Sequence, residues 1–185
     1  MSEELPLFPL NTVLFPGGEL PLRIFEMRYR RLVDICGKQK PFVVVRIRDG
    51  REVGEPAFTC EVGTRVFFEQ LVSQRDGTLG ALVLGEQRVR LSDWRAEPDG
   101  LIFARVHQMS EETCMPIPDD LRPLSATLED QGHAIPDAGT LAWRLADGLP
   151  LDTDTRQALL EENDAARRLE SVRTWLLRYP DWFGA

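Results

Sequence analysis

The chain has 185 residues, 43% of them hydrophobic and 28% charged, a composition that is typical of a globular protein and excludes wholesale disorder. Its net charge of −8 at pH 7 argues against nonspecific binding to nucleic acid or anionic membranes, because such binding needs a surplus of lysine and arginine. No apolar run approaches the ~18 residues of a membrane helix. Cys36, Cys60 and Cys114 are widely spaced, which favours free thiols in a reducing compartment. With an acidic N-terminus unlike a signal peptide, these features predict a soluble, cytoplasmic protein.

The first part of the chain, up to about residue 110, reads as short strands with one helix. Residues 5–10 and 20–26 are apolar segments interrupted by prolines, which are tolerated at the edges and ends of strands. Pro16-Gly17-Gly18 predicts the turn between them. Residues 26–35 carry apolar side chains at helical spacing, and Gly37 predicts the end of that helix.

Later segments rich in β-branched and apolar residues predict further strands at 42–48, 62–72, 79–84, 88–91 and 101–106. Asp-Gly pairs are the strongest short-range signal for a hairpin. They lie between the strand-like runs at Asp49-Gly50, Asp76-Gly77 and Asp99-Gly100. We therefore expect hairpins throughout this half of the chain.

A linker is expected at residues 114–118, because its prolines restrict their own backbone and that of the preceding residues. After the linker, the apolar residues recur at helical spacing. Leu121, Leu124 and Leu128 predict a first helix, which Gly132 ends.

Two further helices are predicted downstream. Asp137 can cap the first of them, residues 138–147. Asp154 followed by Gln157 resembles a capping box and predicts one long last helix, which the Tyr179-Pro180 step ends. Strands first and helices afterwards, without strict alternation, indicate an α+β fold.

Catalytic and metal-binding motifs are missing from the sequence. Gly37-Lys38 lacks the context of a phosphate-binding P-loop, and no G-x-S-x-G or H-E-x-x-H motif occurs. His107 is expected to be a half-buried strand residue rather than a base, and His133 an ordinary loop residue. The sequence therefore predicts no enzyme activity, no metal site and no cofactor.

Two charged clusters each allow two interpretations. Arg23, Arg28, Arg30 and Arg31 form either a basic patch or, as we favour, the solvent-facing side of a helix that pairs with neighbouring acids. The carboxylates of residues 161–164 form either a partner or cation site or, as we favour, negative charge placed well in the first turns of the last helix.

Residues 5–33, LPLFPLNTVLFPGGELPLRIFEMRYRRLV, resemble the start of the Lon protease N-terminal, substrate-binding domain. The matching pieces are a Leu-Pro-Leu-Phe-Pro-Leu strand, a Phe-Pro-Gly turn, a Leu-Pro-Leu-x-Ile-Phe-Glu strand and an Arg-Tyr-Arg helix. Similar matches recur within residues 61–91 and 145–169, so the resemblance spans nearly the whole chain. Arg23 and Met27 depart from the family, which often has histidine and proline there.

The resemblance implies a PUA-like β pseudo-barrel with one embedded helix, followed by a C-terminal α-helical bundle. The barrel is expected over residues 1–113, and the helical subdomain, packed on the barrel, over residues 119–185. The ATPase and peptidase modules of the protease have no counterpart in this sequence, so the resemblance implies a stand-alone copy of the domain.

The function implied by the resemblance is that of a non-catalytic polypeptide-binding module. Its partners would be unfolded or degron-bearing polypeptides and a Lon-type protease. The alternatives are an RNA-binding PUA-like protein, which the acidic charge disfavours, and an enzyme on the same scaffold. Phe15, Pro16 and Leu149 are the candidate binding residues, because they are apolar residues in turns. The interpretation that we favour for them is that they are core residues which cap the barrel.

Overall fold

The computed structural model describes residues 3–110 and 114–179. These residues belong to two compact units, Met1–Met109 (unit 1) and Ser110–Ala185 (unit 2). Within the described chain, the strands lie in unit 1 and the helices after the first one lie in unit 2.

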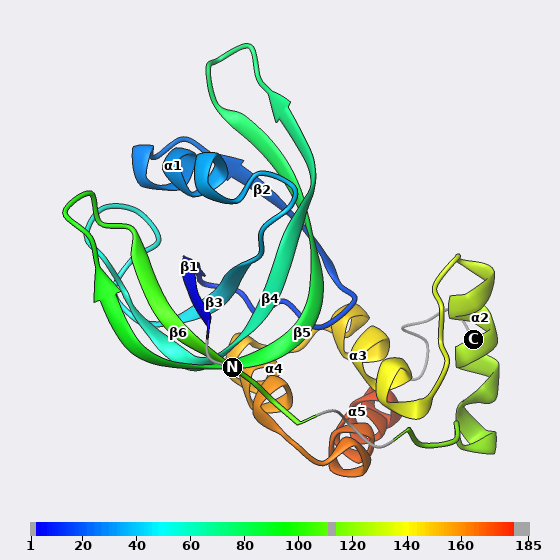
Figure 1. Cartoon of the computed structure of the whole chain (residues 1–185). Helices are drawn as coiled ribbons and strands as arrows, with labels where there is room; N and C mark the ends of the chain where they lie inside the picture. The colour runs from blue at the N-terminus through cyan, green and yellow to red at the C-terminus, as the bar shows by residue number, and fades with distance from the viewer. Residues whose placement is uncertain (1–2, 111–113, 180–185) are drawn as a thin grey trace. The chain divides into compact units, whose positions relative to one another are not determined.

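Unit 1 is a closed sheet with one helix beside it. Its elements are β1 (Glu3–Leu10), β2 (Glu19–Ile24), α1 (Met27–Cys36), β3 (Phe42–Asp49), β4 (Phe58–Ser73), β5 (Leu79–Ala96) and β6 (Ile102–Gln108). The strand order is β2-β5-β4-β3-β1-β6, and β5 also pairs with β6, so the sheet closes as a barrel (Figure 1). β1 and β3 run parallel, whereas the other pairs are antiparallel. The predicted α+β fold with a β pseudo-barrel is confirmed.

β1 and β3 pack hydrophobic clusters on both of their faces. Successive side chains of a strand point to opposite faces. Leu7 and Val43 therefore belong to one buried cluster, whereas Phe8 and Val44 belong to another that includes residues of α1. Burial on both faces is typical of parallel strand pairs and explains the unbroken apolar run at 42–45.

β5 is one strand where the sequence predicted two, on either side of Gly85. Gly85 donates a backbone hydrogen bond to the Gly18 carbonyl at 2.8 Å and accepts one from Gly17 N–H at 2.7 Å. A Cβ atom at position 85 would lie 2.4 Å from the Phe15 carbonyl oxygen. The glycine thus marks a close approach of the first turn to the strand, and the prediction of a strand end there is wrong.

The helix predicted for residues 26–35 is confirmed as α1. Gly37 ends it in the left-handed region, with φ 50°, and donates to the Val33 carbonyl at 2.7 Å. α1 lies across the barrel between the β4–β5 and β5–β6 hairpins (Figure 1). Tyr29 stacks on Phe8 with ring centroids 4.1 Å apart, and Arg30 donates to the carbonyl of Gly77 in the β4–β5 turn. The helix is therefore fixed to the sheet by both apolar and polar contacts.

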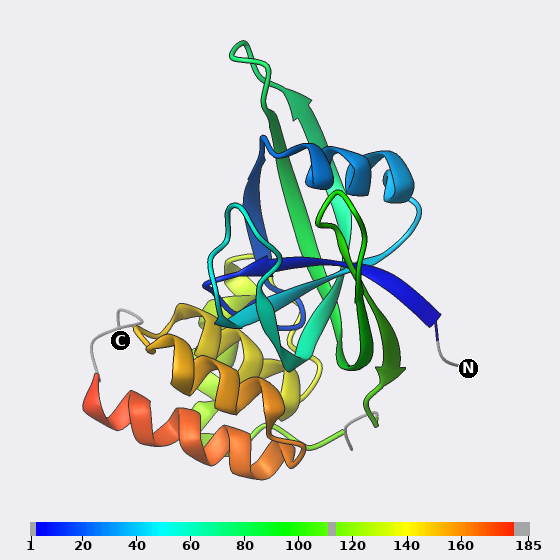
Figure 2. The same ribbon diagram turned by 90° about the vertical axis from the view of Figure 1, so that its left-hand side faces the viewer.

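Unit 2 is helical. Its elements are η1 (Asp119–Leu121), α2 (Arg122–Asp130), α3 (Ala138–Gly148), α4 (Thr153–Glu161) and α5 (Ala165–Arg178). The predicted cap of α3 is confirmed, because the Asp137 carboxylate accepts a hydrogen bond from Thr140 N–H at 2.7 Å. α3 packs beside α5 (Figure 2), where the Arg168 guanidinium lies 3.6 Å from the centre of the Trp143 ring.

The single long last helix of the prediction is instead two helices, α4 and α5. Asp152, rather than Asp154, caps α4 by accepting from Thr155 N–H at 2.8 Å. Asp164 caps α5 by accepting from the N–H groups at the start of that helix. Because an aspartate side chain can replace the helical carbonyl as acceptor, Asp164 starts a new helix and the chain breaks before it. The acidic run at 161–164 therefore lies at this junction and not in the first turns of one helix.

The predicted linker, residues 114–118, has no regular secondary structure. These residues belong to unit 2, within which the Met115 carbonyl accepts a hydrogen bond from Ala138 N–H at 2.9 Å. Residues 111–113 of the predicted barrel and Pro180, the predicted stop of the last helix, lie outside the described residues. The packing of the helical subdomain on the barrel stays a prediction. No helix in the described chain has the length and apolar character needed to cross a membrane.

Candidate functional site

The structure buries two of the three predicted binding residues. Phe15 is 0% exposed and Leu149 is 3% exposed, whereas Pro16 is partly exposed. Phe15 and Leu149 therefore do not present apolar side chains at the surface. Their burial supports the core interpretation, and peptide binding at these positions stays a prediction.

Exposed aromatic side chains instead lie where β4 begins and β5 ends. Phe58 is 69% exposed and Trp94 is 44% exposed, which is unusual for residues of this size. Both line a hollow of about 440 Å³, which we call the Phe58–Trp94 cleft. The residues that line it are Arg48, Pro56, Ala57, Phe58, Thr59, Glu61, Trp94, Ala96 and Ile102. A concave surface with exposed aromatic groups is the kind of site at which proteins bind apolar ligands.

Irregular strand pairing shapes this cleft. The β5–β6 register shifts between Ser92 and Arg95, and Asp93 adopts the left-handed region with φ 53°, which is rare for a non-glycine residue. Trp94 lies in this bulge and donates from Nε1 to the Thr59 hydroxyl at 3.1 Å. The β3–β4 register also shifts on both sides of Ile47. Bulges redirect side chains out of strict alternation, which is why the sequence pattern did not reveal the cleft.

A second hollow adjoins the cleft. It has a volume of about 480 Å³ and is formed by the loop between β3 and β4. Its lining residues are Asp49, Gly50, Arg51, Val53, Gly54, Glu55, Pro56 and Phe58. Pro56 and Phe58 line both hollows, so the two concave surfaces are neighbours that share these residues.

Arg28 fixes the loops that frame these hollows. Its side chain is buried at 5% exposure and pairs with Glu26 at 3.0 Å. Nη2 donates to the Glu52 carbonyl of the β3–β4 loop at 3.1 Å, and Nη1 lies 3.5 Å from the Gly100 carbonyl of the β5–β6 turn. The two loops lie side by side in Figures 1 and 2. The Arg-Tyr-Arg segment thus has a structural role in positioning the rim of the cleft.

The four arginines near α1 do not form a basic patch. Arg23 pairs with Asp76 at 2.5 Å, and Arg31 pairs with Glu97 and with Asp99, the latter at 2.7 Å. The favoured prediction of arginines paired with neighbouring acids therefore agrees with these contacts. The same prediction placed Arg28 on the solvent-facing side of the helix, and this is wrong because Arg28 is buried.

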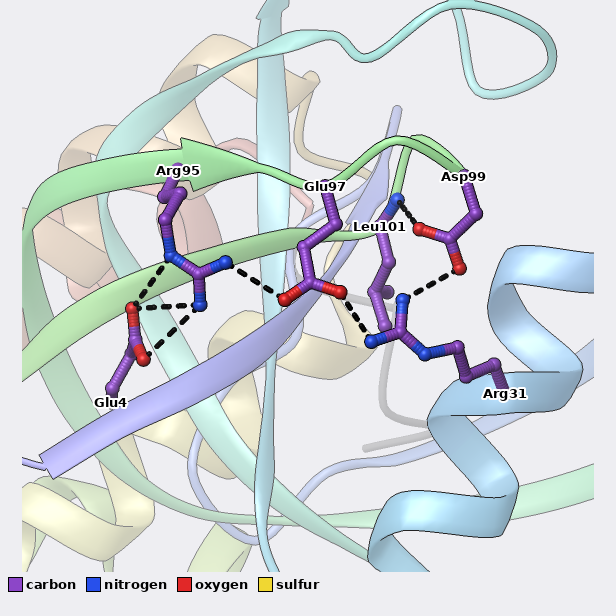
Figure 3. Close-up of polar contacts among 6 residues, drawn as sticks. All are labelled: Glu4, Arg31, Arg95, Glu97, Asp99 and Leu101. Carbon is purple, nitrogen blue, oxygen red and sulfur yellow. Dashed lines mark hydrogen bonds and ion pairs between the residues drawn. The ribbon is translucent and has the colours of Figure 1, made fainter.

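An ion-pair network joins α1, the β5–β6 hairpin and β1 (Figure 3). Glu97 lies at its centre between Arg31 and Arg95, and Arg95 continues to Glu4 at 3.3 Å. Hydrogen bonds from Arg95 and then Arg31 hold the pKa of Glu97 below its ordinary value of 4.5. The hydrogen bond from Arg31 likewise lowers the pKa of Asp99 below 3.8. In the folded protein, the network therefore stabilises the ionised forms of Glu97 and Asp99 relative to their protonated forms.

Replacing Arg31 with methionine is expected to lower the melting temperature at neutral pH but not in acid. The pKa values of Glu97 and Asp99 are lowered in the folded state. The stability that these two carboxylates contribute to the folded state is thus fully present above their unfolded-state pKa values. It is lost as the pH falls through their folded-state pKa values. Thermal melts of the wild type and the Arg31→Met variant from neutral pH to about pH 2 test this: the difference in melting temperature should disappear in acid.

Arg23→Met is the matched control for this experiment. Arg23 has one exposed partner, Asp76, whose pKa is lowered mainly by hydrogen bonds from Thr78. A single exposed ion pair contributes little stability, so this variant is expected to melt like the wild type. An Arg31→Met effect of equal size at all pH values would show that Arg31 acts through packing and not through its charge.

The two histidines and the buried cysteine have the following surroundings in the structure. His107 is exposed and not half-buried as predicted, and its Nε2 lies 2.9 Å from the Ser92 hydroxyl. His133 lies in a loop, as predicted. Burial raises the pKa of the Cys36 thiol to about 11, which disfavours a nucleophilic thiolate. Within the described residues, no group of three His, Cys, Asp or Glu side chains could hold a metal ion.

Comparison with known families tests the resemblance drawn from the sequence. The profile of the ATP-dependent protease La (LON) substrate-binding domain matches residues 4–178. This chain belongs to the Lon substrate-binding domain family. The predicted relationship is thereby confirmed over nearly the whole chain.

Curated relatives that match this chain carry the name Lon protease. Lon protease 2 of Herpetosiphon aurantiacus is 30% identical over 91% of this chain and 23% of the relative. Lon protease 2 of Syntrophobacter fumaroxidans is 35% identical over 96% of this chain and 25% of the relative. The chain therefore spans about a quarter of the length of these proteases.

Solved structures share the fold of the family. A Lon N-terminal domain protein from Xanthomonas campestris superposes with a TM-score of 0.79 at 34% identity, covering 94% of this chain and 98% of that one. The N-terminal domain of the Mycobacterium avium complex Lon protease superposes with a TM-score of 0.69 at 17% identity, covering 94% of this chain and 97% of that one. The second likeness, at its low identity, is one of fold alone.

Proposed function

We propose that this Lon substrate-binding domain is a non-catalytic module that binds polypeptides through the Phe58–Trp94 cleft. The observation that carries the proposal is the exposure of two large aromatic side chains in one concave surface. Burying such side chains against a ligand removes apolar area from water, which is the main favourable term in association. A cleft of about 440 Å³ accommodates one or two side chains of a peptide.

The adjoining hollow supports a ligand in the extended conformation. Alternate side chains of an extended chain lie roughly 7 Å apart on one face. Two neighbouring hollows that share Phe58 in their lining can each receive one such side chain. Extended segments are available in unfolded polypeptides, whereas folded proteins pair or bury most of theirs.

The bound polypeptides, in this proposal, are unfolded or degron-bearing proteins, and a Lon-type protease in the cytoplasm is the partner that uses them. The names of the curated relatives support this assignment.

RNA is disfavoured as the ligand, because Met1–Met109 contains equal numbers of acidic and basic residues and Arg23, Arg28 and Arg31 near α1 are paired with acids.

Phe58→Ala is expected to weaken binding of an unfolded protein about tenfold, because truncation of an aromatic anchor removes much of the apolar contact. Fluorescently labelled β-casein, which is unfolded under native conditions, is a suitable probe, and anisotropy titration gives its Kd. Since Phe58 is mostly exposed, the variant should keep the melting temperature of the wild type.

Val72→Ala is the matched control, because Val72 is 53% exposed on the β4 strand but lines neither hollow. This variant should bind β-casein like the wild type. Equal affinities of the wild type and Phe58→Ala would refute the cleft as the binding site.

A further inference from the structure

We infer that the Phe58–Trp94 cleft selects segments in which an apolar or aromatic residue has an acidic residue within two positions, and that Arg48 binds the acidic group. This inference rests on the proposed polypeptide binding and adds the chemical class of the preferred segment. It comes from the charges that line the cleft.

Arg48 is the arginine among the residues that line the cleft. It lies near the end of β3, is exposed, and lines the cleft together with Phe58 and Trp94. Within residues 3–110 and 114–179, the side chain of Arg48 has no hydrogen-bond or ion-pair partner. Two other arginines of the neighbouring strands are paired: Arg90 with Glu61 at 3.7 Å and Arg105 with Asp93 at 3.3 Å.

Two charged residues line the cleft, Arg48 and Glu61, and the side chain of Arg48 is the one without an ion-pair partner in the described chain. Glu61 is the carboxylate among the lining residues, and its charge is already shared with Arg90. The adjoining hollow differs, because Arg51 lies there with Asp49 and Glu55. Selection for an acidic group is thus expected in the cleft and not in the second hollow.

The chemistry of the guanidinium group fits this role. Arginine binds carboxylates through two parallel hydrogen bonds and tolerates an apolar surrounding better than lysine. A ligand that covers Phe58 and Trp94 would also exclude water around Arg48, which strengthens the ion pair relative to one in bulk solvent. In an extended segment, an acidic residue within two positions of the apolar anchor remains close enough to reach the same hollow.

Three labelled eight-residue peptides test the inference. They share one phenylalanine and differ at the position two residues later, which is aspartate, asparagine or lysine. The full chain is expected to bind the aspartate peptide about tenfold more tightly than the asparagine peptide, as measured by anisotropy at low ionic strength. The preference should shrink at high salt, because exposed charges are screened.

Variants of Arg48 separate the charge effect from the apolar contact. Arg48→Gln should bind aspartate and asparagine peptides equally, with the affinity that the wild type has for the asparagine peptide. Arg48→Lys should keep part of the preference. Arg51→Gln is the matched control and should keep all of it, because Arg51 lines only the second hollow. Thermal melts confirm that each variant is folded.

The outcomes distinguish this inference from the proposed function. If the wild type binds all three peptides equally, or if Arg48→Gln keeps the preference for aspartate, then Arg48 does not select the ligand although the module binds peptides. If the wild type binds none of the peptides and no β-casein, both the inference and the proposed function fail.

Discussion

Replacing Phe15 with alanine is expected to lower the free energy of unfolding by roughly 3–5 kcal/mol, as Phe-to-Ala truncations in cores do. The side chain is fully buried, and the turn that carries it is held by neighbouring hydrogen bonds. One joins the Thr64 hydroxyl to the Leu14 carbonyl at 2.5 Å, and others join Gly17 and Gly18 to β5. The turn therefore has little freedom to close the cavity that truncation leaves. Urea denaturation of both proteins gives the difference in stability.

Phe58→Ala is the matched control, since it removes the same side chain from an exposed position. The two variants should show opposite behaviour: Phe15→Ala loses stability and binds β-casein normally when folded, whereas Phe58→Ala keeps its stability and loses affinity. If Phe15→Ala instead melts like the wild type and loses affinity, the first turn is a binding site, which is the alternative that the sequence left open for Phe15 and Pro16.

Replacing Gly85 with alanine is expected to destabilise the chain by about 2–3 kcal/mol. The new Cβ would lie 2.4 Å from the Phe15 carbonyl oxygen and 3.2 Å from Cγ2 of Thr64. Backbone cannot move aside as a flexible side chain can, so either the turn or β5 must shift and weaken the hydrogen bonds between them. Urea denaturation measures the loss.

Gly80→Ala provides the comparison within the same strand. The nearest atom to its Cβ would be Nε2 of Gln74, at 2.7 Å, the far end of a flexible and exposed side chain. This variant should therefore be close to the wild type in stability. If Gly80→Ala and Gly85→Ala lose equal stability, then the close approach of the first turn to β5 is not the reason that position 85 requires glycine.

The Arg-Tyr-Arg segment links the fold of this family to the proposed site. Arg28 holds the loops around the cleft, Tyr29 packs in the core and Arg30 bonds to the β4–β5 turn. Burial raises the pKa of Tyr29 to about 12, so its hydroxyl stays protonated in the core. The segment is thus a structural signature whose functional effect is indirect, through the shape of the cleft rim.

Features that depend on local interactions could be predicted from the amino-acid sequence alone. The Asp-Gly pairs at Asp76-Gly77 and Asp99-Gly100 form turns because each glycine adopts a positive φ, 81° and 86°. Asp137 caps α3 through a hydrogen bond three residues away, and Gly37 ends α1 for a similar local reason. The strand, turn and helix segments within residues 5–33, which carry most of the family resemblance, are also local, so both the fold class and the family could be predicted from the sequence.

Features that depend on contacts between distant residues emerge only in the folded chain. The role of Gly85 within a continuous β5 follows from the carbonyl of Phe15, which the sequence cannot place beside it. Asp164 begins a separate helix although the apolar spacing continues through the break. The Phe58–Trp94 cleft arises from register shifts in two strand pairs. A bulge adds a residue on one strand only, so it breaks the alternation of side chains at a position set by the partner strand, which a single strand's sequence does not encode.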